Sequence, residues 1–397
     1  MLVSTIELFH RAKKAKRLGM RGSESLQLDW RAMIARKDDL VQRWSASKDS
    51  TPEKLGIAVI KGHAVFTGPH MISSGDRSYS AERFVIATGS KPARPPIPGA
   101  ERAITSDELI HLEEQPNTLV VIGGGFIGLE FGFALARAGS QVTLLQSGSQ
   151  IGPALDDEIR EALLASASEA GLRIRTNANV KQIGANGAVQ AEIDGRAELF
   201  SADQVLLATG RPSNVEPLNP SAAGIELDRS AVKVNEYLQS VSAPHVYAAG
   251  DAAGKHQHSP VAWYEGSIAA RNALTGNLQE IDFSVFPTAI FTIPAIGQVG
   301  LTEKEALRRG LNAKVNRLSY DSNPAAGVRD ETEGMVKVVY EEGTERILGV
   351  HVIGAHAEDI IQIAAMAMKG GLKKSAVASM HYVFPTIGGA IFDTMAI

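Results

Sequence analysis

The chain has 397 residues, of which 44% are hydrophobic and 21% are charged, and this composition is typical of a globular protein with two or three domains. The 40 basic and 44 acidic residues give a net charge of −4, so the charge balance favours no nucleic-acid partner. The absence of cysteine excludes disulfides, thiolate metal sites and a cysteine nucleophile within this sequence. No apolar run is long enough to span a bilayer or to form a signal peptide, so we expect a cytoplasmic protein without a membrane partner.

The N-terminal part predicts two helices, a small meander and one buried strand. Residues 1–20 carry apolar side chains at helical spacing, and residues 29–44 repeat that spacing before Pro52, where we expect the helix to end. Glycine-punctuated segments that predict an antiparallel meander follow at 57–61, 63–67, 71–73 and near 79. Residues 84–86 then form an apolar strand that leads into Ala-Thr-Gly-Ser, and the prolines of 91–99 indicate a linker.

Residues 119–146 contain the motif on which the interpretation of the chain depends. An apolar run at 119–122 predicts a buried parallel strand, and a second strand is predicted at 141–145. The first strand is followed by the three glycines of a G-x-G-x-x-G turn, which are Gly123, Gly125 and Gly128. A helix that ends at Gly139 follows this turn. A glycine turn between a strand and a helix is typical of dinucleotide binding, and the alternative is a glycine-rich turn in an unrelated α/β unit.

Each glycine has a physical role in such a turn. The first permits the tight bend, the second lets the backbone approach a pyrophosphate, and the third lets the helix pack closely on the strand. The N-terminus of the helix adds N–H groups and a partial positive charge for the anion. Gln146 ends the second strand, where an acid usually selects NAD and a nearby Arg usually accommodates NADP. The choice between NAD and NADP is therefore left open.

Further strands and helices follow in the order expected for nucleotide-binding domains. A helix is predicted at 156–170, and strands are predicted at 172–175, 180–183 and 189–193. Residues 204–212 repeat the earlier pattern of a strand, Ala-Thr-Gly, a basic residue and proline, which suggests two related nucleotide-binding domains. The strand at 245–250 is followed by Asp251, whose carboxylate can accept hydrogen bonds from the hydroxyls of a sugar or a ribityl chain. A helix is predicted at 261–274.

From residue 283 onward the pattern predicts a separate α+β domain with an antiparallel sheet. Its expected strands are 289–293, 299–301, 314–319, 335–340 and 347–353, and its expected helices are 303–309 and 358–369. The second of these helices is apolar nearly all round, so we expect it to be buried in a core or against another subunit.

These landmarks together resemble the pyridine nucleotide-disulfide oxidoreductases, a flavoprotein family that includes dihydrolipoamide dehydrogenase, glutathione reductase and mercuric reductase. The resemblance covers essentially the whole chain and rests on six motifs, which are 87–89, 123–130, 208–212, 249–251, 300–303 and 384–386. It implies an α/β fold class with two Rossmann-like FAD/NAD(P)-binding domains, the first of them incomplete, and a C-terminal α+β dimerisation domain. The implied domains are 1–105 and 236–283 for FAD, 106–235 for NAD(P), and 284–397 for the interface of a homodimer.

The resemblance also implies roles for individual residues. The positions implied to contact FAD are Thr88, Gly89, Ser90, Asp251, Gln257, His258, Ser259 and Pro260. The positions implied to contact NAD or NADP are Gly123, Gly124, Gly125, Phe126, Ile127, Gly128, Glu130, Gln146, Val180 and Gly210, and Arg211 is a further cofactor-binding candidate. Glu130 matches a glutamate that pairs in relatives with a lysine beside the flavin, which makes it the one candidate catalytic residue that is retained.

The sequence departs from the family pattern in three places. Met1 aligns inside a later helix, so the first strand–turn–helix unit, which binds the ADP half of FAD in relatives, is expected to be missing. The redox cysteine pair and the lysine partner of Glu130 lie in that same stretch. Relatives also end with a proton-transferring His and Glu, and these positions are Phe384 and Gly389 here. Phenylalanine has no titratable proton, so Phe384 cannot act as an acid or a base toward a thiol.

Two functional hypotheses follow. The first is an FAD-dependent NAD(P)H oxidoreductase that passes hydride to the flavin and onward to a small-molecule acceptor, without the usual disulfide chemistry. The second is a catalytically inactive truncated paralogue or fragment that dimerises and binds only a nucleotide. We expect these 397 residues to bind NAD(P)H and to hold FAD weakly or not at all. No metal site is expected, because His256 and His258 have no cysteine and no second clustered ligand beside them. His381 is expected to be a structural histidine, and Trp263 is expected to pack in the core.

Overall fold

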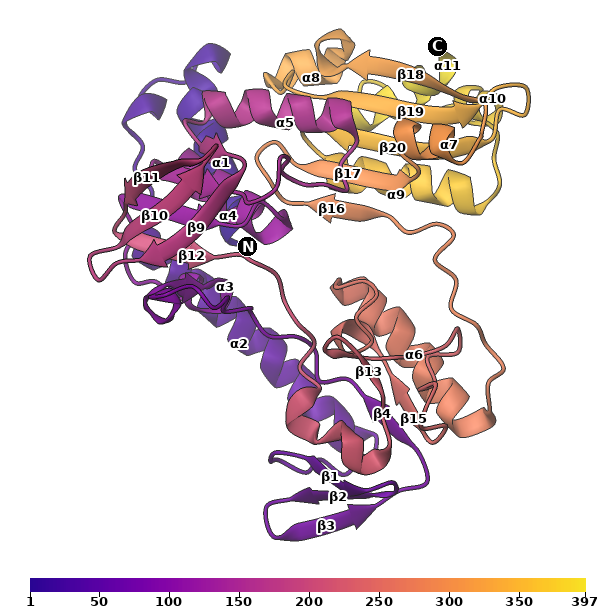
Figure 1. Ribbon diagram of the computed structural model, residues 1–397. Helices are drawn as coiled ribbons and strands as arrows, with labels where there is room; N and C mark the ends of the chain where they lie inside the picture. Colours follow the sequence, from indigo (N-terminus) through magenta and orange to yellow (C-terminus); the bar gives the residue numbers. More distant parts are fainter. The chain divides into compact units, whose positions relative to one another are not determined.

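The computed structural model describes residues 1–397, apart from the side chains of Ser47, Asp49, Ser50 and Glu53. The chain forms two compact units, each assembled from separate segments. Unit one comprises Met1–Asp39, Arg94–Thr209 and Phe283–Ile397, and unit two comprises Leu40–Ala93 and Gly210–Asp282. Helix α2 (Trp30–Lys54) begins in unit one and ends in unit two (Figure 1).

A five-stranded parallel sheet forms the centre of unit one (Figure 1). Its strands, in spatial order, are β5 (Ile104–Thr105), β12 (Gln204–Leu207), β6 (Thr118–Ile122), β7 (Gln141–Leu145) and β8 (Arg173–Arg175). Strand β6 is buried on both faces, as its continuous apolar run predicts. Leu119 and Val121 contribute to one hydrophobic core, whereas Val120 and Ile122 contribute to another.

Different elements cover the two faces of this parallel sheet. The face of Leu119 and Val121 is covered by residues of α1 (Leu2–Lys14), α4 (Phe126–Ala138) and α5 (Asp157–Glu169). The face of Val120 and Ile122 packs on an antiparallel sheet made of β9 (Ala178–Ile183), β10 (Ala188–Ile193) and β11 (Arg196–Ser201). A short helix, α3 (Ser106–Leu109), follows β5 and begins with a capping box.

The C-terminal part of unit one contains an antiparallel five-stranded sheet, which confirms the predicted α+β domain (Figure 1). Its strands, in spatial order, are β16 (Thr288–Ile290), β17 (Ile296–Gly300), β20 (Ile347–Ile353), β19 (Met335–Glu341) and β18 (Ala313–Ser319). Its helices are α7 (Glu303–Arg308), α8 (Pro324–Arg329), α9 (Ala357–Lys369), α10 (Lys374–Ala378) and α11 (Ala390–Ala396). Helices α9 and α11 bury the valines of one face of this sheet, and α5 and α7 lie over the other face.

Unit two contains three small sheets, the C-terminal part of α2 and the long helix α6. Strands β1 (Val65–Gly68), β2 (Met71–Ser74) and β3 (Arg77–Ser80) form the predicted antiparallel meander. Strand β4 (Phe84–Ile86) pairs in parallel with β15 (Val246–Ala248), and β13 (Leu227–Asp228) pairs with β14 (Ala231–Val232). Helix α6 (Ser259–Thr275) packs on β15.

Several sequence expectations are wrong in detail. Helix α2 continues past Pro52 because this proline lies in the last turn, where Leu55 N–H still donates to the carbonyl of Thr51. Residues 57–61 form no strand, and their apolar side chains are exposed. Strand β11 was not expected from its sequence. Most of the apolar side chains of helix α9 are buried as expected, and the 76% exposure of Met366 in a single chain does not test the expected burial against another subunit.

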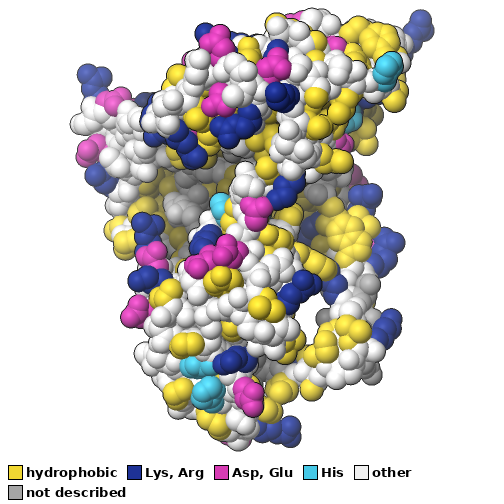
Figure 2. Space-filling view, turned by 90° about the vertical axis from the view of Figure 1, so that its right-hand side faces the viewer, with side chains coloured by type: hydrophobic (Ala, Val, Ile, Leu, Met, Phe, Trp, Pro, Cys, Tyr) yellow, Lys and Arg dark blue, Asp and Glu magenta, His cyan; other side chains and the backbone are white. Residues whose placement is uncertain are grey.

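Charged side chains of both signs are interspersed with hydrophobic ones over the face shown in Figure 2, in keeping with the nearly balanced composition. Among the described residues, no helix combines the length and the apolar character needed to cross a bilayer.

Candidate functional site

The glycine-rich turn of unit one joins β6 to α4. Gly123 has φ +114°, a left-handed conformation that glycine adopts without strain. A Cβ atom built on Gly123 lies 2.2 Å from the carbonyl oxygen of Ala208, and one built on Gly128 lies 2.0 Å from the carbonyl oxygen of Gly123. Both positions therefore require glycine, the first because of strand β12 and the second because α4 packs tightly on the turn.

Gly125 differs from the other two glycines because it faces open space. It is the N-cap of α4, and because it has no side chain it cannot cap the helix itself. A Cβ atom built on it meets nothing within 4 Å. The first N–H groups of an α-helix have no intrahelical partner, and they carry the positive end of the helix dipole. A pyrophosphate can therefore approach the backbone at residues 125–128. The turn fits a dinucleotide.

The side chain of Gln146, which follows β7, is hydrogen-bonded to the glycine-rich turn. Its Oε1 atom accepts a hydrogen bond from Gly124 N–H at 2.8 Å. Ser147 and Ser149, which follow, are exposed. Val180, on β9, packs against the core beneath the carboxyl ends of β6 and β7. The structure thus brings Gln146 to the glycine turn.

Glu130 lies in the second turn of α4 and is largely buried. Burial raises the pKa of its carboxyl group, and a hydrogen bond from Phe291 N–H to Oε1 at 3.0 Å partly offsets this rise. The partner of Glu130 is therefore a backbone amide of the C-terminal part of unit one.

The second group of candidate residues lies in unit two, where β4 and β15 end side by side. Ser90 donates a hydrogen bond to Oδ2 of Asp251. Arg211 binds the same serine twice, with Nε 3.0 Å from Oγ and Nη2 3.2 Å from the carbonyl oxygen. Gln257 donates to the carbonyl of Arg211 at 2.6 Å. Arg211, a cofactor-binding candidate that the sequence assigned to neither coenzyme, therefore lies in the same hydrogen-bonded group as Ser90 and Asp251.

The loop from residue 250 into α6 completes this second group. Asp251 sits in a single 3-10 turn (Gly250–Ala252), and its carboxylate is only partly buried, so it can accept hydrogen bonds from a ligand. His258 is the N-cap of α6, while Ser259 and Pro260 form its exposed first turn. Burial lowers the pKa of His258, although Asp251 opposes this effect. These residues fit the ribityl and flavin part of FAD.

Glu265 is a buried acid beside this site that the sequence analysis did not single out. Its side chain is fully buried on α6, and Oε2 accepts a hydrogen bond from Gly250 N–H at 2.6 Å. Its other oxygen has no hydrogen-bond partner among the described residues. Burial raises the pKa of Glu265 to about 7. A single glutamate in an alanine-rich helix carries no sequence signal of burial, so only the structure identifies it.

Comparison with known proteins agrees with this geometry. The family model described as pyridine nucleotide-disulphide oxidoreductase matches residues 10–266, and the model of the corresponding dimerisation domain matches residues 286–394. The chain belongs to the pyridine nucleotide-disulphide oxidoreductase family. Members of this family use FAD and NAD(P)H, and the dimerisation domain supports the expected homodimer.

Several enzymes of the family resemble the chain over most of its length. Mercuric reductase of Bacillus cereus is 36% identical over 373 residues, which cover 92% of this chain and 59% of that protein. Glutathione reductase of Nostoc sp. is 34% identical over 363 residues, which cover 88% of this chain and 79% of that protein. Dihydrolipoyl dehydrogenase of Thermus scotoductus is 33% identical over 402 residues, which cover 99% of this chain and 86% of that protein. The chain thus spans less than two thirds of the Bacillus mercuric reductase.

Solved structures support the fold class. The HOCl-induced flavoprotein disulfide reductase RclA from Escherichia coli has a TM-score of 0.87 and 27% sequence identity, over 99% of this chain and 89% of that chain. A Cu(II) complex of RclA has a TM-score of 0.88 and 26% identity, over 100% of this chain and 88% of that chain.

The sequence analysis matched Phe384 and Gly389 to the positions of the family's His and Glu. The side chain of Phe384 is 68% exposed. A Cβ atom built on Gly389 lies 2.8 Å from Cε2 of Tyr382, whose ring stacks on Phe392 with ring centroids 4.8 Å apart. The Tyr382 hydroxyl donates to Asp393 at 2.5 Å, and this bond raises the pKa of the tyrosine. The tyrosine ring therefore lies where the first carbons of a glutamate side chain would need to be.

The remaining aromatic and histidine candidates lie apart from these groups. Trp263 is 75% exposed, so the expectation that it packs in the core is wrong. His381 is also exposed. Within the described part of the chain, no three His, Asp or Glu side chains are grouped as a metal ion requires.

Proposed function

We propose that this chain forms the nicotinamide site and the flavin-side residues of an FAD-dependent NAD(P)H oxidoreductase whose electron acceptor is not a protein-bound disulfide. The observation that carries the proposal is the turn at 123–128, where two glycines are sterically required and the third opens the N-terminus of α4 to an anion. An unrelated glycine-rich turn has no reason to combine these features.

The residues have distinct tasks in this proposal. The backbone at 125–128 binds the pyrophosphate of the coenzyme, and Gln146 shapes the neighbouring ribose position. Asp251 accepts hydrogen bonds from the ribityl hydroxyls, and Arg211 and Ser90 hold its carboxylate in place. FAD, when bound, supplies a ring that takes up hydride and releases electrons singly or in pairs.

Two positions favour an acceptor other than a disulfide. Phe384 has no proton to transfer, and Tyr382 occupies the space beside Gly389. A dithiol reaction needs both a thiol and a proton donor, whereas hydride transfer from nicotinamide to flavin needs neither.

A metal ion or a quinone satisfies the electron balance of such a reaction. One NADH provides two electrons, which reduce two Cu(II) ions to two Cu(I) ions, or one Hg(II) ion to Hg(0), with release of NAD⁺ and a proton. The same two electrons with one further proton convert a quinone to its hydroquinone. The names of two similar proteins, mercuric reductase and the Cu(II) complex of RclA, support a metal ion as the first acceptor to test.

The test has a binding step and a turnover step. Calorimetric titration with NADH and NADPH should show saturable binding of at least one coenzyme to the folded chain. With FAD in excess and oxygen excluded, NADH oxidation should then accelerate when Cu(II), Hg(II) or a benzoquinone is added. Failure to bind either coenzyme, with FAD present, contradicts the proposal.

The second candidate is a nucleotide-binding protein without catalysis, and the loss of the proton-transferring pair at Phe384 and Gly389 favours it. This candidate predicts that NADH binds but is not oxidised by any of these acceptors at saturating FAD. Saturable binding of FAD, followed by flavin fluorescence during a titration, separates the two candidates further, because the second requires no FAD site.

A further inference from the structure

A row of polar side chains crosses the antiparallel sheet of unit one. Strand register places Gln298 of β17 opposite His351 of β20, His351 opposite Lys337 of β19, and Lys337 opposite Arg317 of β18. These four residues share one face, because directly paired residues point to the same side of a sheet. Only 2% of Lys337 and 1% of His351 is exposed. Polar groups buried on an otherwise apolar sheet require partners from another element.

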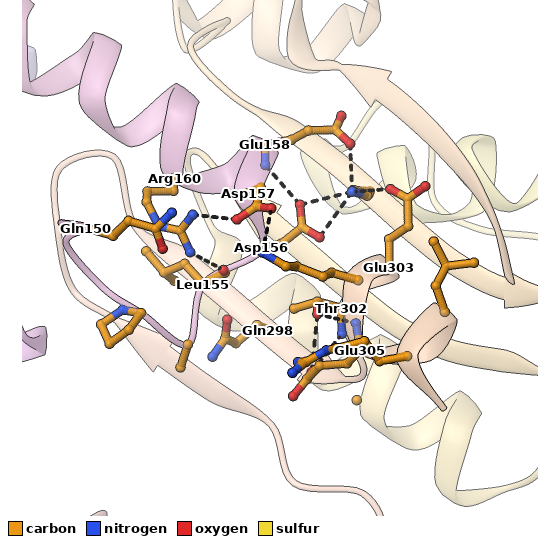
Figure 3. Close-up of a pocket in the computed structure, with 17 residues that line it drawn as sticks. Gln150, Leu155, Asp156, Asp157, Glu158, Arg160, Gln298, Thr302, Glu303 and Glu305 are labelled. Atoms are coloured by element: carbon orange, nitrogen blue, oxygen red, sulfur yellow. Dashed lines mark hydrogen bonds and ion pairs between the residues drawn. The ribbon is translucent and has the colours of Figure 1, made fainter. Parts of the chain in front are cut away.

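Those partners for Lys337 are three carboxylates that converge on its ammonium nitrogen. Figure 3 shows the carboxylates of Asp156, Glu158 and Glu303 around one nitrogen atom, beside a cavity of about 630 Å³. From Lys337 Nζ, the distances are 3.0 and 3.1 Å to the two oxygens of Asp156, 2.6 Å to Glu158 and 3.0 Å to Glu303. Arg317 forms a second, two-armed contact with Glu158. An ammonium with its hydrogens engaged in this way has a single allowed position.

Two of the carboxylates belong to the beginning of α5. Asp156 is the N-cap of this helix, and its side chain accepts a hydrogen bond from Glu158 N–H at 3.1 Å. Lys337 therefore fixes the first turn of α5 against the sheet. Removal of one partner from a buried charged group costs more than removal of a surface ion pair, so this anchor is stronger than the exposed salt bridges of the molecule.

The first turn of α5 in turn fixes the loop that precedes it. Arg160, which is buried, donates from Nε to the carbonyl of Ile151 at 3.0 Å and from Nη2 to the carbonyl of Leu155 at 2.7 Å. Its remaining nitrogen binds Asp157 at 2.5 Å. Residues 151–155 are thus tied to α5 at both ends.

This loop closes directly onto the glycine-rich turn. Gly152 N–H donates to the carbonyl of Gly124 at 2.9 Å. The side chain of Ile151 lies 3.0 Å from a Cβ atom built on Gly124, so it packs against the turn on the side that Gln146 also contacts. A shift of α5 therefore moves the loop and, with it, the backbone that faces the pyrophosphate.

We propose that Lys337 is a positioning residue for the nicotinamide-coenzyme site, acting through Asp156, Arg160 and the backbone contact between Gly152 and Gly124. The expected effect of Lys337, which is tighter binding of the coenzyme, rests on the proposed function. Lys337 also orders the loop 146–155, and this effect does not depend on any ligand.

The first test compares coenzyme binding between matched variants. Lys337→Met should weaken binding of NADH, or of NADPH if that is the preferred coenzyme, by roughly 2- to 30-fold, with the change appearing in KM rather than in kcat. Lys304→Met is the control, because Lys304 lines the same cavity but is exposed and lies 3.9 Å from its carboxylate partner. Asp156→Asn keeps an oxygen for the helix cap, so it should fold and show a smaller change in the same direction. Unchanged affinity in both Lys337→Met and Asp156→Asn overturns the proposal.

The second test needs no nucleotide. Amide hydrogen exchange at Gly152 and Gly124 should be faster in Lys337→Met than in the parent chain and in Lys304→Met, while exchange in β10 stays the same. Equal exchange at both glycines in all three proteins overturns the proposal, even if NADH binds normally. Faster exchange together with no coenzyme binding by the parent chain supports the positioning role and refutes only the proposed function.

Discussion

The proposed nicotinamide site of unit one and the proposed flavin-side group of unit two are built in different ways. The first is made largely from one continuous stretch, residues 118–152, in which a strand, a turn, a helix and a second strand follow each other. The second gathers residues from three distant segments, around Ser90, Arg211 and Asp251, and its central contact joins residues 161 positions apart. The first relies on backbone shape, whereas the second relies on side-chain hydrogen bonds.

This difference indicates how each site should respond to change. A site that binds its ligand through backbone N–H groups is sensitive to any added side-chain volume. It is insensitive to the loss of a single polar side chain. A site made of side chains shows the reverse behaviour, because each polar group has partners that are left unpaired when it is removed. Four substitutions test this contrast.

The largest effect is expected for Gly128→Val. The new side chain would meet the carbonyl oxygen of Gly123, and a backbone atom cannot move aside. We expect unit one to lose about 3 kcal/mol of stability and coenzyme binding to become undetectable by calorimetry. Gly132→Ala in the same helix is the control, because its Cβ would meet the nearest atom at an ordinary 3.6 Å. Normal binding by Gly128→Val would show that the turn is not the coenzyme site.

Glu265→Gln tests the buried acid of unit two through pH. The pKa of Glu265 is raised from 4.5 to about 7, so the folded state keeps a proton that the unfolded state loses as the pH rises through this window. Stability from this group is therefore full below pH 4.5 and decreases toward pH 7, by about 2 kcal/mol between pH 5 and 7. Urea unfolding of unit two should show this decrease in the parent chain and in the exposed control Glu226→Gln, but not in Glu265→Gln. Equal pH slopes in all three proteins would contradict the burial of this acid.

Asp251→Asn tests the side-chain site directly. Loss of the charge should weaken hydrogen bonds to ribityl hydroxyls by about 2 kcal/mol, which is roughly a 30-fold rise in the Kd for FAD. Flavin fluorescence during titration measures this change, and Asp228→Asn, an exposed change in the same unit, should leave the Kd unaltered. The affinity for NADH should stay constant in both variants. A change in NADH affinity would contradict the independence of the two sites.

The smallest effect is expected for Gln146→Glu. The glutamate keeps an oxygen for Gly124 N–H and adds a negative charge where a 2′-phosphate would lie. The ratio of NADPH Kd to NADH Kd should rise about fivefold, which is about 1 kcal/mol. Gln150→Glu adds the same charge farther along the exposed loop and should alter the ratio less. An unchanged ratio in Gln146→Glu would place the adenosine ribose elsewhere.

Local sequence patterns predicted the contiguous site better than the dispersed one. The strand at 118–122, the glycine turn and the position of Gln146 follow from steric rules that act within about thirty residues. The charged cluster around Lys337 depends on a helix that lies about 180 residues away in the chain, so no local rule reveals it. One hint was present, since Lys337 interrupts an apolar strand and Asp156 and Glu158 open a helix.

Other differences have equally local causes. Residues 57–61 have an apolar pattern typical of a strand, but an extended segment becomes a strand only when it pairs with another. Strand β11 alternates charged and apolar residues weakly, and its pairing with β10 supplies the order that its sequence does not indicate. The sequence assigned Arg211 to neither coenzyme, and its contacts with Ser90 place its side chain in the hydrogen-bonded group of Asp251.

The spacing of the segments has a consequence for synthesis on the ribosome. The glycine turn has all its close neighbours once residue 209 has emerged, since Thr209 is the last of them. The contact between Gly250 and Glu265, beside Asp251, forms only after residue 265 has emerged, and the contact between α5 and Lys337 forms only after residue 337. Domains fold as units while the chain is still being made. We therefore expect the turn that is proposed to bind phosphate to form first, and the contacts of Lys337 with α5 to form last.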